Sequence, residues 1–468
     1  MLALFIVVTL IRAIFHKPKK FEGVKIEDAD IDVDKVAEHL SKAIQCKTIS
    51  RSNPDEIDWS EFEKFHAFLD EAYPLIKQNT VKENVSKASL IYRWKGKNPD
   101  LEPMALLSHQ DVVPVAEGTE DDWTHDAFSG YNDGEIIWGR GALDMKNHLI
   151  CVMEAVESLM EEGFQPERDV YLCFGHNEEI VCSKESGADE IVKVLRSRGI
   201  HLDSVLDEGS ALLRLDVKGL IHTYIAAVGV AEKGYADMKL TVHDKGGHTS
   251  AAPKHSGMAK LANTIKDVER HQFKSHMLPF LTELFDTVGR KATYLGRVVM
   301  CNVWLLKPII KLVLKAIPES ASMVRTIQSI SMCEGSPEPN VLPQRPSITV
   351  NFRPLPGDTV DDVEKHIRKA VRYKDLEVER LYSKEATKFS PDSRAFNAIR
   401  KVEEGLHPND VAVAPYLVMG GTDSYRYGEI CDNILRYAPF NVSVELFLTT
   451  HATNERCPIS ALKESVVF

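Results

Sequence analysis

The stretch MALLSHQDVVPV, residues 104–115, is an apolar run interrupted by a histidine and a carboxylate. Such a run is typical of a buried strand, in which residues two apart point to the same face. His109 and Asp111 are therefore predicted to lie side by side. Because burying an unpaired polar group costs free energy, the rest of the chain is expected to supply partners for both.

Strands and helices alternate after this stretch. Beyond Asp144 the sequence turns helical and closes on Gly163, a natural C-terminal cap. The strand-like runs DVYLCFG and SVLDEG come next. This alternation predicts an α/β domain with a mostly parallel sheet flanked by helices, in which ligands gather at the carboxyl ends of the strands. The helix carries apolar residues at helical spacing: Leu149, Val152, Met153, Val156, Leu159 and Met160.

The character of the sequence changes around Glu232. Three alternating, strand-like runs, ADMKLTVH, SITVNFRP and DLEVERLY, enclose two helical ones. That order predicts a small ferredoxin-like α+β domain, inserted at about residues 230–382. The first domain is then made of two parts, residues 33–229 and 383–468.

An unusually apolar insert, residues 273–325, lies within the second domain. Lys307, Lys311 and Lys315 recur at every fourth position, which predicts an amphipathic helix. Such a helix suits a lid, a subunit interface or a membrane-facing surface. Additional core packing is the alternative.

The N-terminal segment, residues 1–20, reads MLALFIVVTLIRAIFHKPKK. Its apolar run is shorter than the roughly 20 residues of a spanning helix, so it is predicted to be a marginal signal anchor or a buried apolar helix. The basic residues after the run favour a cytoplasmic body, whereas sequons at Asn84 and Asn441 favour a secretory lumen. We expect membrane association, or a vacuolar, lumenal or extracellular location.

Composition excludes one class of partner. The chain has 57 basic and 69 acidic residues and a formal net charge of -12, whereas nucleic-acid binding rests on a basic field. We therefore expect a small-molecule substrate and no nucleic acid. The eight cysteines form no CxxC pair and are read as buried thiols, although a disulfide or two stays open.

Each predicted strand end of the first domain carries acidic or imidazole groups. Several carboxylates aimed at one sheet edge would repel each other unless cations were bound there. Imidazoles and carboxylates without cysteine suit catalytic zinc, with cobalt or manganese as alternatives. One carboxylate can bridge two ions about 3.5 to 4 Å apart. The residues concerned are His109, Asp111, Asp144, Glu178, Glu179, Asp207, Glu208 and His451.

A family resemblance covers roughly residues 35–460. HQD, WGRGALDMK, GHNEE, DEG, GGHTSAAP, NFRPLPGDT, GGTD and HATNE occur in the order found in the co-catalytic zinc metallopeptidases related to aminoacylase, glutamate carboxypeptidase and DapE desuccinylase. The chain most resembles the branch of carboxypeptidase S and the N-fatty-acyl amino acid synthase/hydrolase. The resemblance implies a zinc-peptidase-like catalytic domain, two Zn²⁺ ions per subunit, and a homodimer formed through the inserted lid domain.

Carried over by position, the resemblance implies five metal ligands, with Asp144 bridging both ions and Glu178 as general base. Asp111 would orient a ligating imidazole, and the Asp144–Met145 peptide would be cis. Arg353 would bind the substrate carboxylate. The implied ligands are His109, Asp144, Glu179, Asp207 and His451; the implied substrate contacts are His248, which reaches a partner subunit's site, Asn340, Gly420 and Gly421.

Two positions depart from the family pattern. Asn177 stands where relatives usually have aspartate, and Tyr425 separates Ser424 from Arg426, which leaves the role of Arg426 open. The predicted activity is zinc-dependent hydrolysis of the amide in an N-acyl amino acid or C-terminal dipeptide with a free carboxylate, or the reverse condensation. The alternatives are a carboxypeptidase acting on longer peptides and a metal-free, non-catalytic paralogue.

Overall fold

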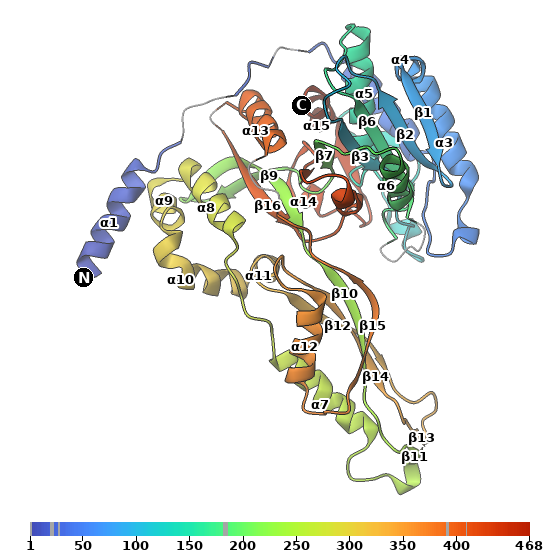
Figure 1. The fold of residues 1–468 in the computed structure, drawn as a ribbon, viewed down its shortest axis with the longest axis vertical. Helices are drawn as coiled ribbons and strands as arrows, with labels where there is room; N and C mark the ends of the chain where they lie inside the picture. Colours follow the sequence, from blue (N-terminus) through green and yellow to red (C-terminus); the bar gives the residue numbers. More distant parts are fainter. Residues whose placement is uncertain (1, 19–22, 27–28, 181–185, 390–392, 409) are drawn as a thin grey trace.

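A mixed, ten-stranded sheet forms the centre of the large domain (Figure 1). The computed structural model describes residues 2–18, 23–26, 29–180, 186–389, 393–408 and 410–468. The strand order is β1-β2-β6-β3-β7-β17-β9-β8-β18, with β16 beside β9. Strands β6, β3, β7 and β17 run parallel, so the prediction of a mostly parallel sheet describes this central part. The strands are β1 (Thr80–Val85), β2 (Ser89–Trp94), β3 (Met104–His109), β6 (Val170–Gly175), β7 (Ser204–Asp207), β8 (Leu212–Val217), β9 (Ile221–Glu232), β16 (Val411–Val418), β17 (Ile434–Arg436) and β18 (Asn441–Val442).

Helices cover both faces of this sheet, because its central strands are apolar on both sides. In β6, Leu172 and Phe174 face the core that contains α5, whereas Tyr171 and Cys173 face the core that contains α6. Such doubly buried strands are typical of parallel sheets. The helices are α2 (Val33–Ile44), α3 (Trp59–Ala72), α4 (Pro74–Asn79), α5 (Lys146–Glu161), α6 (Gly187–Ser197), α13 (Arg394–Leu406), α14 (Val444–Phe447) and α15 (Ile459–Val467).

Smaller elements complete the large domain. Gly163 adopts φ +72° just after α5, as the predicted C-terminal cap requires. All seven described cysteines are unpaired. Six are buried, which confirms the prediction of buried thiols for them, whereas Cys333 is exposed. A three-stranded sheet is formed by β4 (Tyr131–Asn132), β5 (Ile136–Trp138) and β19 (Arg456–Pro458), and short 3₁₀ helices are η1 (Pro54–Glu56), η2 (Glu120–Asp122) and η4 (Asp423–Glu429).

The lid domain projects from the large domain and has the predicted ferredoxin-like order (Figure 1). Its antiparallel sheet runs β12-β14-β10-β15, and α7 and α12 share its core. Strand β12 was not predicted, because it lies at the edge and its second half is exposed, so it lacks an alternating apolar pattern. The elements are β10 (Tyr235–Thr241), β11 (Gly247–His248), η3 (Thr249–Ala251), α7 (Gly257–Arg270), β12 (Ile327–Glu334), β13 (Val341–Leu342), β14 (Ser347–Arg353), α12 (Val360–Ala370) and β15 (Glu377–Lys384).

The apolar insert folds back onto the large domain, although it interrupts the lid domain in sequence. Phe280 and Leu281 of α8 join the core formed by β9 and β16. For α8, the alternative of additional core packing is therefore confirmed. Helix α10 contains the three regularly spaced lysines, as predicted. No helix in the described part of the chain is long and apolar enough to cross a membrane. The helices are α8 (Pro279–Lys291), α9 (Tyr294–Met300), α10 (Val303–Ala316) and α11 (Pro318–Ser322), with the N-terminal α1 (Leu2–Phe15) packed against α9.

Candidate active site

Three parallel strands bring the predicted site residues to one edge of the sheet. His109 is the last residue of β3, and its register partner Gly175 is the last residue of β6. Glu178 and Glu179 follow β6, and Glu208 follows β7 directly. Because parallel strands end at the same edge, side chains far apart in sequence converge there.

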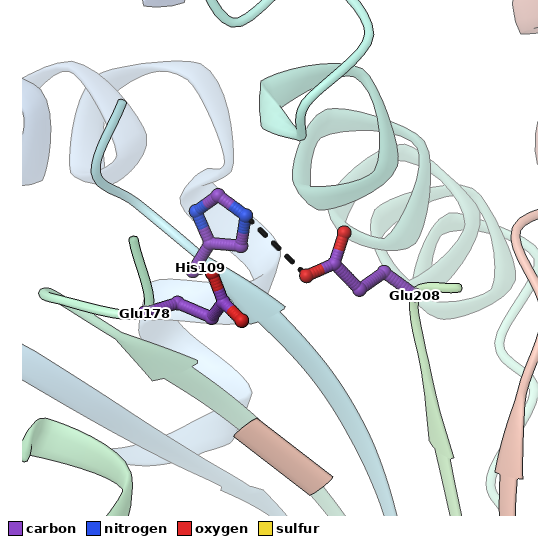
Figure 2. Close-up of side chains that lie close together, drawn as sticks. All are labelled: His109, Glu178 and Glu208. Carbon is purple, nitrogen blue, oxygen red and sulfur yellow. Dashed lines mark ion pairs between the residues drawn. The ribbon is translucent and has the colours of Figure 1, made fainter. Parts of the chain in front are cut away.

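The buried imidazole of His109 is the centre of the first group. Its Nε2 lies 3.0 Å from Asp144 Oδ1 and 3.5 Å from Glu208 Oε1. Figure 2 shows the carboxylate of Glu208 directed at this ring, with Glu178 beside it. Ligand atoms of His109, Glu178 and Glu208 all lie within 4.8 Å of one another, close enough to share one metal ion.

Asp144 joins this group to a second one. Its other oxygen, Oδ2, lies 3.0 Å from His451 Nε2, which in turn is 3.0 Å from Glu179 Oε1. Each oxygen of one carboxylate therefore faces a different imidazole, the arrangement that a bridging ligand between two metal ions needs. The Asp144–Met145 peptide is cis, as the family resemblance implied.

Glu208, and not Asp207, faces the imidazole of His109. The Oδ2 of Asp207 accepts a hydrogen bond from the backbone N–H of Ser424 (2.9 Å) and belongs to neither ligand group among the described residues. Successive residues at the end of a strand point to opposite sides, so only one of two adjacent acids can face the cluster. In this geometry Glu208, and not the predicted Asp207, is the candidate ligand, and Asp207 instead accepts a hydrogen bond from the first turn of η4.

Asp111 is fully buried beneath the cluster and organises three of its members. His109 Nδ1 lies 2.9 Å from the backbone oxygen of Asp111 and 3.4 Å from its carboxylate, so the carbonyl is the nearer acceptor. The carboxylate also accepts the backbone N–H groups of Glu178 (3.1 Å) and Glu179 (3.2 Å), and the hydroxyl of Ser50 (2.6 Å). With its Nδ1 hydrogen held in this way, His109 presents Nε2 to the cluster.

The cluster is rich in negative charge, which fits divalent cations. Burial, together with the Asp144 carboxylate, raises the pKa of Glu208 well above its ordinary value and that of Glu179 to about 7. Burial lowers the pKa of the His109 imidazole, but the surrounding carboxylates outweigh it and raise that pKa overall. Two imidazoles and four carboxylates without cysteine form a donor set suited to catalytic zinc.

Sequence reasoning missed a buried ion pair that supports Asp144. Arg140 Nη1 lies 2.7 Å from Glu455 Oε2, and both side chains are almost completely buried. Glu455 Oε1 accepts the backbone N–H groups of Leu143 (2.8 Å) and Asp144 (3.1 Å). Arg140 lies in the motif WGRGALDMK and Glu455 in HATNE, each a few residues from a predicted ligand. Their opposite charges beside Asp144 and His451 could have indicated this ion pair.

A positively charged pocket, here called the arginine pocket, adjoins the cluster through Glu178. Arg353 lies 4.4 Å from the ring centre of Tyr235 and makes no ion pair within the described part of the chain. Arg426 is also in the wall, but Asp189 (3.1 Å) and Asp423 (3.3 Å) hold its guanidinium. The lining residues are Glu178, Lys233, Tyr235, Arg353, Tyr382, Lys384, Gly420, Gly421, Thr422, Tyr425 and Arg426. Three predicted substrate contacts, Arg353, Gly420 and Gly421, are thus brought together.

A second, mostly apolar pocket adjoins the cluster through Asp144 and Glu208. It is here called the apolar pocket, and it contains no basic side chain other than His148. Its lining residues are Leu143, Asp144, Met145, Asn147, His148, Glu208, Gly209, Ser210, Ala211, Ala438, Phe440, Val442, Phe447 and Thr450. The two pockets thus touch different members of the cluster, which leaves the cluster between a cationic and an apolar cavity.

His248 and Asn340 lie together at the far tip of the lid domain, where β11 pairs with β13 (Figure 1). The backbone N–H of Thr249 donates to the Asn340 carbonyl (3.1 Å). His248 is exposed and Asn340 lines the same shallow hollow. The strands β11 and β13 lie far from the ends of β3, β6 and β7, so these two predicted substrate contacts are not brought to the cluster in this structure (Figure 1).

Comparison with known proteins connects this site to a family. The pattern of Peptidase family M20/M25/M40 matches residues 105–468. "Probable carboxypeptidase S-like 2" of Dictyostelium discoideum is 34% identical over 438 residues, which covers 92% of this chain and 83% of that protein. "N-fatty-acyl-amino acid synthase/hydrolase PM20D1.1" of Danio rerio is 31% identical over 443 residues, covering 93% and 84%.

Solved structures agree on the fold. Human carnosine dipeptidase 1 superposes with a TM-score of 0.62 at 14% identity, over 94% of this chain and 95% of that one. Sso-CP2, an M20 family metallo-carboxypeptidase from Sulfolobus solfataricus, also gives 0.62, at 18% identity over 94% and 97%. Taken with the family match and relatives above 30% identity over nearly the whole chain, these findings establish that the chain belongs to Peptidase family M20/M25/M40 and is a metallopeptidase or amidohydrolase.

Proposed function

We propose that this enzyme is a two-zinc amidohydrolase that cleaves the amide bond of N-acyl amino acids or C-terminal dipeptides with a free carboxylate. The observation that carries the proposal is the position of Glu178. Its carboxylate belongs to a ligand group with His109 and also lines the arginine pocket. An acid-base group, a metal cluster and a carboxylate-binding cation therefore adjoin one another.

Two groups of residues would hold the ions. His109, Asp144 and Glu208 suit one, and Asp144, Glu179 and His451 suit the other. Bound zinc would polarise the amide carbonyl and lower the pKa of water. Cobalt or manganese would fit the same nitrogen and oxygen donors.

Glu178 is the general base in this proposal. Burial raises its pKa well above the ordinary value, against the opposing effect of His109, so the carboxylate is a stronger proton acceptor than an exposed one. Asp111 holds the backbone N–H of Glu178 and so fixes the start of the side chain. The proton that Glu178 accepts would be passed to the leaving amine.

Arg353 would bind the free carboxylate of the substrate. A guanidinium forms two parallel hydrogen bonds with a carboxylate, and Arg353 makes no ion pair with a described residue. Two lysines line the same pocket, but Lys384 is paired with Glu232 (2.9 Å) and burial lowers the pKa of Lys233 to about 7, so Arg353 is the main cation available to a substrate carboxylate. The backbone at Gly420 and Gly421 leaves room for the substrate because neither residue has a side chain.

The apolar pocket favours an apolar acyl group on the other side of the amide. Ala211, Phe440, Val442 and Phe447 provide its apolar wall, next to the proposed ligands Asp144 and Glu208. The Danio rerio relative is named an N-fatty-acyl-amino acid synthase/hydrolase, which supports a long-chain acyl group here. Condensation of a fatty acid with an amino acid would use the same groups in reverse. The Dictyostelium discoideum relative, named as carboxypeptidase S-like, supports the peptide alternative.

The activity is tested with purified enzyme loaded with zinc. Glu178→Gln should retain about two zinc ions per chain and lose at least about 100-fold in kcat, because it cannot take up a proton in the same way. Glu429→Gln, an exposed surface change, is the matched control. Substantial turnover by Glu178→Gln would refute its role, and a zinc-free wild type that stays inactive after zinc is restored would favour a non-catalytic paralogue.

A substrate screen tests the substrate class. Long-chain and short-chain N-acyl amino acids, dipeptides and longer peptides should be compared, each as the free carboxylate and as the carboxamide. We expect long-chain acyl amino acids to be preferred, and Arg353→Ala to raise KM for carboxylates more than for carboxamides. Preference for longer peptides would favour the carboxypeptidase alternative, and equal cleavage of carboxamides by the wild type would refute the arginine clamp.

A homodimer formed through the lid domain would bring His248 and Asn340 to the second subunit's cluster, where an imidazole could stabilise the oxyanion of the tetrahedral intermediate. Mixing inactive Glu178→Gln chains with inactive His248→Ala chains tests this. In a mixed dimer one site has both residues intact, so activity should return after subunit exchange. No recovery, despite mixed dimers in solution, would refute a role across the interface.

A further inference from the structure

Helix α1 is held against the insert with one face fixed inward. The backbone carbonyls of Thr9 and Leu10 accept hydrogen bonds from Asn302 Nδ2 (3.2 Å) and Tyr294 Oη (3.2 Å). Ala13, one turn further on, is fully buried. The inward face therefore packs on the region of α9, and the opposite face of α1 is turned away from the protein.

That outward face continues an exposed apolar surface on the insert. Nearly half of the large exposed apolar side chains in the described chain come from three short helices, α1, α9 and α10. They are Phe5, Ile6, Val7, Leu10, Ile11, Ile14 and Phe15 of α1, Tyr294, Leu295 and Val299 of α9, and Trp304, Ile309, Leu312 and Val313 of α10. We call this set the apolar face. Soluble proteins rarely expose so many neighbouring apolar groups without a binding partner.

The three helices form one surface rather than separate patches. The guanidinium of Arg12 on α1 lies 5.8 Å from the ring centre of Trp304 on α10 and also donates to the carbonyl of Cys301 (3.3 Å). Figure 1 shows α1, α9 and α10 gathered at one end of the molecule, with α8 between them and the central sheet. The exposed side chains of α1 and α10 therefore adjoin at this contact.

The charges around the apolar face are opposite in sign to those of the whole protein. The helices α1, α9 and α10 contain no acidic residue, whereas the chain as a whole has a net charge of -12. Lysines and arginines extend their alkyl stems along apolar surface and keep the charge at the rim. The exposed basic residues are Arg12, Lys307 and Lys315, with Lys17 just after α1. Arg297 and Lys311 are half-buried, and Lys311 Nζ donates to the carbonyl of Ser275 (3.3 Å).

We propose that the apolar face binds the surface of an anionic phospholipid bilayer, with α1 and α10 lying in the plane of the interface. The contacts of Thr9 and Leu10 with the insert hold α1 along the protein surface, an orientation that suits an interfacial helix. Apolar side chains with a basic rim are the features of interfacial helices, and the rim complements anionic headgroups. A second copy of the same face would instead meet like charges, which opposes association.

Membrane binding would place the catalytic domain beside amphiphilic molecules that partition into the bilayer. This consequence, unlike the binding itself, rests on the proposed function, because only an acyl substrate would be concentrated there. Lipid binding and hydrolysis of a short, water-soluble acyl amino acid are therefore measured separately. Failure of one measurement then leaves the other interpretable.

The test is co-flotation of the full chain with phospholipid vesicles. Wild-type protein should float with vesicles of phosphatidylcholine containing about 30% phosphatidylserine, and binding should weaken as salt is raised. Ile309→Glu/Leu312→Glu should reduce the partition coefficient at least tenfold, because two exposed contacts of the apolar face become charged. Leu381→Glu, at an exposed apolar position on the lid domain, is the control and should leave binding unchanged.

Three outcomes would overturn the proposal. They are absence of wild-type flotation, an equal loss in the Leu381→Glu control, and a wild-type dimer that the double variant dissociates while vesicle binding is absent. The last outcome would assign the face to a second copy of this chain. Hydrolysis of a soluble short-acyl substrate should be the same in all variants, which shows that each is folded.

Discussion

The buried carboxylate of Glu232 connects the two domains at the arginine pocket. Its Oε1 lies 2.5 Å from Arg436 Nε, its Oε2 lies 2.9 Å from Lys384 Nζ, and Thr422 donates to it at 2.9 Å. Glu232 ends β9 of the large domain, whereas Lys384 ends β15 of the lid domain. Removing its charge should therefore loosen the junction that positions the Gly421 loop.

The size of the effect follows from burial. Burial raises the pKa of Glu232, but Arg436 and Lys384 outweigh it and lower that pKa from 4.5 to about 2. A carboxyl stabilised to this extent on folding contributes roughly 3 kcal/mol when ionised. Glu232→Gln leaves two buried cations without a counter-charge, for which a cost of about 3–5 kcal/mol is typical. We therefore expect the variant to lose about 3–5 kcal/mol of unfolding free energy at pH 7.

Urea unfolding, followed by both tryptophan fluorescence and far-UV circular dichroism, measures this loss. The pH dependence gives a second check. Because the folded pKa is lowered, the contribution is complete above about pH 4.5 and is lost as the pH falls toward about 2. The difference in unfolding free energy between wild type and Glu232→Gln should therefore decrease as the pH falls from about 4.5 to about 2. Glu429→Gln, which breaks an exposed ion pair with Arg196, should cost less than about 1 kcal/mol.

Two results would refute this reasoning. A loss below about 1 kcal/mol for Glu232→Gln would mean that the junction tolerates unpaired charge, contrary to the expectation for buried ions. Adding Arg436→Met to Glu232→Gln should recover part of the loss, because it removes one of the two stranded cations. A double variant less stable than Glu232→Gln alone would show that packing, and not charge, dominates the site.

The remaining predictions concern the metal cluster and one distant acid. Glu208→Gln should weaken zinc affinity by more than about tenfold, whereas Asp207→Asn should change it by no more than a few-fold. Competition with a chromogenic chelator measures both affinities. The reverse result would restore Asp207 as the ligand. Asp111→Asn should lower zinc affinity about 10- to 100-fold and lower turnover without unfolding the strand, and unchanged affinity would contradict its orienting role. Burial raises the pKa of Glu403 from 4.5 to about 7, despite the hydrogen bond that Tyr437 donates to it (2.7 Å). Between pH 4.5 and pH 7 this carboxyl therefore ionises in the unfolded chain but stays protonated in the folded one. The free energy of unfolding should fall by up to about 3 kcal/mol over that range. Glu403→Gln should flatten that slope in urea titrations, and an unchanged slope would exclude Glu403 as its source.

Much of the metal cluster was predictable because it follows from local patterns and one topological rule. Apolar strands that end in acids or imidazoles, separated by helices, imply a parallel sheet whose strand ends meet at one edge. His109, Asp144, Glu179 and His451 were found in this way together with the family motifs, and the structure brings them together. The choice between Asp207 and Glu208 was not predictable in this way, since two adjacent acids at a strand end satisfy the same pattern.

The sequence by itself determined the alternation of apolar strands and helices in the large domain and the set of acids and imidazoles at the strand ends, because these depend on residue periodicity and motif spacing. Only the tertiary structure decided which of two neighbouring carboxylates faces the cluster, that the insert covers β9 and β16 of the large domain, and that α1 adjoins α10 to form one apolar face. The physical reason is that these contacts join residues far apart in the sequence, and no local pattern records which side chains or apolar faces will meet.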